Sequence, residues 1–161
     1  MNIIECAIKM KEERRNHYRQ LAVFASDTEL ERLAILLAEA NSELISRLEK
    51  LNKSPEVASL TETALSADVC VFSPRFDARH PEIALSHDSD AYLHVVNEIR
   101  DSVEFYNQLE SESDSEQMKV IYRKLSEMER EHLIEVANIY SFVEDPRTYL
   151  EWGEFSNLKQ L

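Results

Sequence analysis

The positions of glycine and proline constrain the fold of this chain most strongly. The 161-residue sequence contains one glycine, in its C-terminal tail, and four prolines, which are Pro55, Pro74, Pro81 and Pro146. Residues 1–51 and 90–143 therefore contain neither residue type. Because glycine and proline punctuate or break helices, two such long uninterrupted stretches favour continuous helices. The sequence predicts an all-α fold built from two helical blocks.

Each block is expected to form a helical hairpin, because its apolar residues recur at helical spacing. In the first block, Ser26-Asp27-Thr28 is a turn and N-cap signal followed by acidic residues. In the second block, the polar run 110–116 marks the turn. The expected helices cover about residues 2–25, 28–51, 90–109 and 115–142.

The two blocks repeat each other with a constant offset of 88 residues. The offset holds through both helices and the turn, without a gap, in the pairs Tyr18 and Tyr106, Leu21 and Leu109, Leu37 and Leu125, Glu39 and Glu127, and Glu43 and Glu131. Two hairpin copies joined by about 35 residues predict a pseudo-symmetric four-helix bundle, and so long a connection can cross the bundle from end to end. We expect one domain, with hairpins over 2–51 and 90–142, a crossover over 52–89 and a tail over 143–161.

Charge and cysteine content limit the partners and the compartment. The formal net charge of −13 argues against nucleic acid or an anionic membrane surface as a partner. No apolar run has signal-peptide character or the length of a membrane span. Cys6 and Cys70 form no CxxC pair, so we expect two inert thiols, neither a zinc ribbon nor a disulfide framework, and a reduced cytoplasmic location.

Glu129 and His132 are the strongest candidates for a chemical site. They are three residues apart and so lie on one face of a helix. That face also carries the apolar residues Ile121, Leu125, Met128, Val136 and Ile139. A carboxylate and an imidazole directed at a core are costly unless they have partners. The pattern therefore predicts half of a metal site built between helices.

The residues around these positions resemble a known family. Residues 18–22 and 105–109 each place a tyrosine shortly before a leucine, and residues 125–133 carry the Glu-x-x-His pattern. In these motifs the chain resembles the rubrerythrin-like branch of the ferritin-like superfamily. That resemblance implies a crossover four-helix bundle, an iron- or peroxide-linked oxidoreductase activity, and two iron ions held by one Glu from each of two helices and Glu-x-x-His from the other two.

Only two of the six ligand positions implied by the resemblance carry ligands here. Glu129 and His132 match; the other four positions hold Lys11, Asn41, Leu44 and Ile99. A cation and two hydrocarbon side chains cannot offset the charge of two metal ions. We expect the di-iron site to be lost and replaced by a buried ion pair between Lys11 and Glu129. Asn41, His132 and one of the second-shell tyrosines, Tyr18 or Tyr106, are expected to complete its hydrogen bonds.

Two pairs spaced i, i+4 are chelating alternatives: Glu13 with His17, and His94 with Glu98. We interpret both as surface helix pairs. Glu98 is one residue out of phase with the implied ligand position, and a local register shift would be needed to turn it inward.

Two function classes remain open. The first is a metal-free helical scaffold that acts through its surface, by dimerisation or partner binding, with no cofactor. The alternative is a residual iron-binding protein or oxidoreductase that uses Glu129, His132 and recruited neighbours. A homodimer is expected, because the resemblance implies association and because the aromatic tail residues need cover. A short helix over 55–67 and an apolar patch over 69–72 are expected in the connection.

Overall fold

The computed structural model describes residues 1–59, residue 70 and residues 89–144. Four long helices account for most of this part: α1 (Ile3–Phe24), α2 (Thr28–Asn52), α5 (Ser89–Glu112) and α6 (Glu116–Glu144). A single short turn of helix, α3 (Pro55–Ala58), follows α2. The described residues contain no strand. The all-α expectation is confirmed, and the expected helix ends fall within a few residues of the observed ones.

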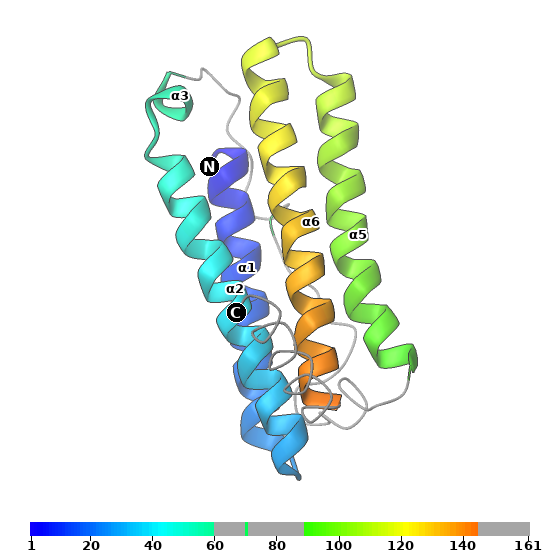
Figure 1. Cartoon of the computed structure of the whole chain (residues 1–161). Helices are drawn as coiled ribbons and strands as arrows, with labels where there is room; N and C mark the ends of the chain where they lie inside the picture. The colour runs from blue at the N-terminus through cyan, green and yellow to red at the C-terminus, as the bar shows by residue number, and fades with distance from the viewer. Residues whose placement is uncertain (60–69, 71–88, 145–161) are drawn as a thin grey trace, which may run out of the picture.

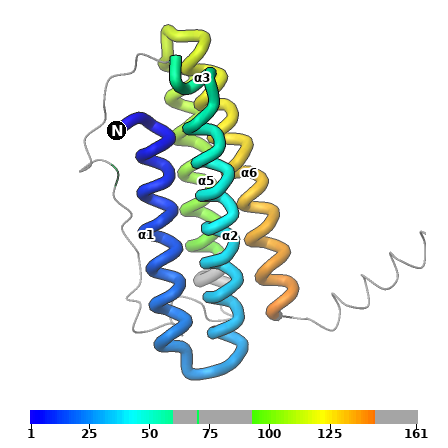
Figure 2. Tube along the Cα trace, turned by 90° about the vertical axis from the view of Figure 1, so that its left-hand side faces the viewer, coloured from blue at the N-terminus to red at the C-terminus, as the bar shows by residue number. Residues whose placement is uncertain are grey.

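The four long helices lie side by side with their axes roughly parallel (Figures 1 and 2). α1 and α2 form one antiparallel hairpin, α5 and α6 form the other, and the hairpins meet where α2 packs against α6. α2 ends beside α3 at one end of the molecule, whereas α5 begins at the opposite end (Figure 1). The helices on either side of the connection, α2 and α5, therefore run in the same direction, and the two hairpins turn at opposite ends of the bundle.

Local capping explains where the first two helices begin. Asn2 and Glu5 form a capping box, in which the Asn2 side chain accepts from the Glu5 N–H at 2.8 Å and the Glu5 carboxylate accepts from the Asn2 N–H at 3.1 Å. Asp27 caps α2 by accepting from the Leu30 N–H at 2.8 Å, as the sequence predicts. Each cap satisfies a backbone donor that the first turn leaves without a helical partner.

The core consists of two hydrophobic clusters. One lies towards the α1–α2 turn and includes Tyr18, Leu21, Leu37, Ile99 and Val136. The other lies towards the α3 end and includes Ile4, Ala7, Leu44, Tyr106 and Leu125. Along α1, α2 and α6, the residues between the two clusters are buried but polar or charged: Lys11, Arg14, Asn41, Glu129 and His132. We call these five residues the polar layer.

The internal repeat is visible in burial. Leu37 and its counterpart Leu125 are 0% and 1% exposed. Tyr18 and Tyr106 are both buried, and Glu39 and Glu127 are both exposed. Equivalent positions in the two hairpins thus face equivalent surroundings, as expected of two copies of one structural unit.

The cysteines contradict the expectation of two inert thiols. Cys6 and Cys70 form a disulfide that joins α1 to a residue 64 positions further along the chain. The Lys9 Nζ also donates to the Cys70 carbonyl at 2.8 Å. Sequence spacing could not predict this bond, because it depends on a tertiary approach of the connection to α1. Since disulfides persist mainly in oxidising compartments, the cysteines no longer argue for a reduced cytoplasm.

Several expectations about the connection and the tail concern residues outside the described ranges. The expected helix over 55–67 begins as α3 with Pro55 at its first position, and residues 60–67 lie outside the described residues. The same is true of the apolar patch over 69–72, apart from Cys70, and of the aromatic tail beyond residue 144. Among the described helices, none combines the length and the apolar character needed to cross a membrane.

Candidate functional site: a buried polar layer

The central feature of the polar layer is an ion pair between α1 and α6. Lys11 follows Ile4 and Ala7 and precedes Tyr18 and Leu21 on the same buried stripe of α1, so its side chain is directed into the core. Its ammonium lies 2.8 Å from Oε1 and 3.1 Å from Oε2 of Glu129. The two side chains are only 5% and 4% exposed. The ion pair expected between Lys11 and Glu129 is therefore present.

Burial shifts the protonation equilibrium of this lysine. The pKa of Lys11 is lowered to about 8 as the net result of opposing effects: desolvation and the nearby Arg14 guanidinium lower it, while Glu129 raises it by attraction and hydrogen bonding. The carboxylate is thus what keeps the ammonium charged in the core near neutral pH. Without it, the lysine would be buried as an uncompensated charge.

Arg14 is a second buried cation, and the sequence analysis did not identify it. It lies three residues after Lys11 and four before Tyr18, on the inward stripe of α1. This spacing was the signal that could have identified it. The Arg14 Nη2 lies 3.8 Å from Oε2 of Glu98 on α5. The Glu98 side chain is 17% exposed and is directed at the buried Arg14. It is therefore not an ordinary surface residue.

His132 is held neutral inside the bundle. Burial, together with the nearby charges of Lys11 and Arg14, lowers the pKa of His132 to about 2. Its Nδ1 atom is buried and has no hydrogen-bond partner among the described residues. The expectation that His132 completes the hydrogen bonds of the ion pair is therefore not met at this atom. A protonated imidazole here would place a third positive charge beside two others.

Asn41 also departs from its expected role. Its Nδ2 donates to the Leu37 carbonyl one turn earlier, at 2.8 Å, and not to the Glu129 carboxylate. Its Oδ1 is buried and has no hydrogen-bond partner in the described part of the chain. The Asn41 side chain thus forms a local hydrogen bond to the preceding turn of its own helix and not the expected one to Glu129. Asn side chains commonly form such local bonds to the backbone.

The remaining substituted positions are filled with hydrocarbon. Ile99 packs in the cluster near the α1–α2 turn, and Leu44 packs in the cluster near α3. Tyr18 and Tyr106 lie in these clusters as well, one on each side of the polar layer. Burial raises the pKa of Tyr18 to about 12 and raises the pKa of Tyr106 well above its usual range. Both phenols are therefore neutral at any physiological pH.

The donor set does not suit a pair of metal ions. Both oxygens of Glu129, the one carboxylate in the polar layer, lie within hydrogen-bonding distance of the Lys11 ammonium. Across the described ranges, no three His, Cys, Asp or Glu side chains gather closely enough to hold a metal. Di-iron centres need several carboxylates to bridge the ions and offset their charge. The Lys11 ammonium and the Arg14 guanidinium, both in the same layer, would repel the metal ions of such a centre.

The i, i+4 pairs noted in the sequence have other contacts. Glu13 Oε1 lies 2.7 Å from the Lys9 Nζ, and these half-buried side chains form an ion pair one helical turn apart. Glu98 contacts Arg14, as described above. The interpretation of Glu98 as a surface residue was wrong, because the buried guanidinium on α1 draws it inward.

Comparison of the chain with protein-family models, with curated proteins and with solved structures finds no match. The resemblance to rubrerythrin-like proteins therefore depends on the motifs in the sequence alone.

Proposed function

We propose that this chain is a ferritin-like four-helix protein in which a buried ion pair has replaced a di-iron site. On this proposal it is a metal-free helical scaffold that acts through its surface by binding a partner or a second copy of itself. It carries out no oxidoreductase reaction.

The observation that carries this proposal is the occupation of Glu129. Lys11 lies within 3.1 Å of both carboxylate oxygens, so an ammonium stands where a metal ion would need to bind. The ammonium supplies the compensating positive charge that a buried carboxylate requires. A metal ion would have to displace Lys11 from Glu129, and Glu98, the other carboxylate whose charge acts on Lys11, already lies 3.8 Å from the Arg14 guanidinium.

The arrangement of the helices supports the proposed descent. Two hairpins repeat each other at a fixed offset, and α2 and α5 run in the same direction (Figure 1). A bundle of this kind requires a long connection between its halves, which is the arrangement of ferritin-like folds.

One observation favours the alternative, a residual mononuclear iron site. The neutral imidazole of His132 has a buried Nδ1 atom without a hydrogen-bond partner in the described part of the chain, and neutral imidazole nitrogen is a good metal ligand. His132 is one helical turn from Glu129, so the two side chains share a face.

Metal content after iron loading distinguishes these functions. The purified protein is incubated anaerobically with Fe(II), exposed to air, passed over a desalting column and analysed for iron and for its visible spectrum. The proposal predicts no retained iron above that of a His132→Leu variant. Near-stoichiometric iron with an oxo-bridged ferric spectrum would refute it. One ion per chain, lost in His132→Leu, would establish the residual site instead.

A further inference from the structure

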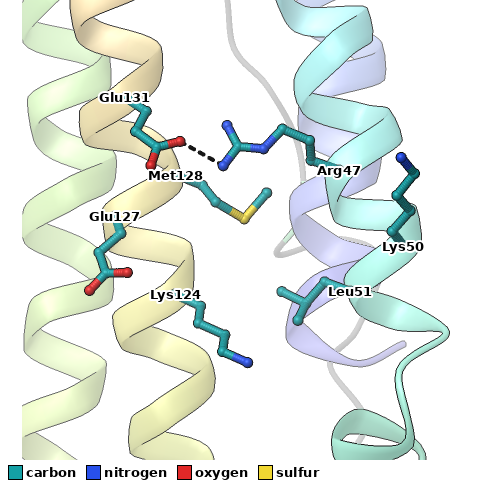
Figure 3. A pocket seen from close by; sticks show the side chains of 7 residues that line it. All are labelled: Arg47, Lys50, Leu51, Lys124, Glu127, Met128 and Glu131. Atoms are coloured by element: carbon teal, nitrogen blue, oxygen red, sulfur yellow. Dashed lines mark ion pairs between the residues drawn. The ribbon is translucent and has the colours of Figure 1, made fainter.

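A shallow surface groove lies between α2 and α6. It has a volume of about 350 Å³ and lies near the α3 end of the bundle (Figure 3). Leu51 from α2 and Met128 from α6 supply its apolar floor, and Met128 extends across the gap towards α2 (Figure 3). Methionine is flexible and polarisable, which suits a surface that accepts a partner's apolar side chain.

The groove is less acidic than the chain as a whole. Its lining includes three cations, Arg47, Lys50 and Lys124, and two carboxylates, Glu127 and Glu131, whereas the chain has 18 basic residues against 31 acidic ones. Arg47 and Lys124 reach into the gap from opposite helices, whereas the Glu127 carboxylate is directed away from α2 (Figure 3). The groove therefore offers two inward cations above an apolar floor.

The present partners of these cations are easily exchanged. Arg47 Nη2 lies 2.6 Å from Oε2 of Glu131, and Lys124 Nζ lies 2.8 Å from Oε2 of Glu56 on α3. All four side chains are at least 41% exposed. Exposed ion pairs contribute little to stability, so a carboxylate from outside could replace Glu131 or Glu56 at small energetic cost.

We propose that this groove binds an acidic amphipathic peptide segment of a partner protein. An apolar side chain of the partner would rest on Leu51 and Met128. Carboxylates one turn away on either side of it would engage Arg47 and Lys124. This is the mode in which an amphipathic helix docks in a groove between two helices, with the charges fixing its register. The inference rests on the proposed surface function and specifies its partner.

A labelled model peptide tests the groove directly. The probe is a fluorescein-labelled peptide of about 15 residues made of Glu, Leu and Ala, with leucines spaced three and four residues apart so that they share one helical face. Fluorescence anisotropy is followed as full-length protein is added. We expect saturable binding that falls when the leucines are changed to serine, and no binding of a peptide in which lysine replaces glutamate.

The chain offers a closely matched control variant. Arg47→Glu with Lys124→Glu reverses the two groove cations. Arg123→Glu with Lys119→Glu reverses one arginine and one lysine that also form exposed ion pairs, with Glu110 and Glu116. Both double variants change the net charge equally. The groove variant should lose about ten-fold or more in affinity, while the control variant should bind about as well as the wild type.

Three results would overturn the proposal. They are the absence of saturable binding, an equal loss in both double variants, and equally tight, competing binding of a 15-nucleotide single-stranded DNA, which would indicate a general polyanion site. Circular dichroism of each variant establishes that it is folded. Iron loading tests the interior of the bundle, and peptide binding tests the groove. Iron uptake together with peptide binding would refute only the metal-free function. Absence of both iron uptake and peptide binding would refute only the groove assignment.

Discussion

The Lys11 ammonium and the Glu129 carboxylate meet inside the bundle, at 2.8 and 3.1 Å, although 118 residues separate them in the sequence. They join the first long helix to the last, between two hydrophobic clusters. A buried ion pair is weak evidence for stability, but each partner alone would be strongly unfavourable. The pair therefore links the two hairpins in one register, because a shift of either helix would separate the charges.

Stability should fall in acid because of His132. Burial lowers its folded-state pKa from 6.5 to about 2, so the unfolded chain binds a proton between these pH values and the folded chain does not. The stabilisation is complete above pH 6.5 and is lost as the pH falls towards 2. The His132 contribution to the free energy of unfolding should drop by about 1.4 kcal/mol per pH unit in this window.

The His132→Leu variant isolates this contribution. Leucine already occupies the equivalent position of the first hairpin, Leu44, and has a similar volume. The variant should remain folded at pH 7.5 and should show a shallower loss of stability between pH 6 and pH 4 in urea titrations. Parallel pH profiles for wild type and variant would show that His132 titrates in the folded protein as it does in the unfolded chain.

Asn41→Leu should be neutral or stabilising. Its Oδ1 is buried with no hydrogen-bond partner in the described part of the chain, and a buried unsatisfied acceptor costs about 1–3 kcal/mol. Leucine removes that acceptor and extends the apolar surface between Leu37 and Leu44. The midpoint of urea unfolding is the measurement. A loss of more than about 2 kcal/mol would mean that the amide oxygen has a partner, such as a bridging water.

Removal of the disulfide should lower stability substantially. Cys6 and Cys70 close a loop with a sequence separation of 64, and the entropy of closing such a loop in the unfolded chain corresponds to about 4 kcal/mol. The double variant Cys6→Ser, Cys70→Ser and the dithiothreitol-reduced wild type should therefore melt at similar, lower temperatures. Two reactive thiols in the denatured, unreduced wild type would show that the bond does not form.

The sequence was sufficient to predict the helices and the central ion pair. Long stretches without glycine or proline predicted the four long helices, and the 88-residue offset correctly paired positions such as Leu37 with Leu125. The inward phase of Glu129 called for a buried counter-charge, and Lys11 was the cation at the matching position of α1. The helices followed from helical periodicity, which a sequence displays directly, whereas Lys11 was identified through the ligand positions that the resemblance implies.

The parts that the sequence did not predict depend on contacts between elements. Whether Glu98 turns inward depends on Arg14, on another helix. Whether Cys6 finds Cys70 depends on the path of a connection without helical periodicity. Asn41 had two possible partners, and the choice of the Leu37 carbonyl reflects local geometry that residue type alone does not determine.

A double-mutant cycle tests the central claim, that Lys11 is the counter-ion of Glu129, most directly. The free energies of unfolding of wild type, Lys11→Met, Glu129→Leu and the double variant are measured in urea at pH 7. Each single change should cost about 3–5 kcal/mol, because it leaves a buried charge uncompensated, while the double variant should lose far less than the sum. Single effects below about 1 kcal/mol that add in the double variant would contradict the account, because the two charges would then not depend on each other.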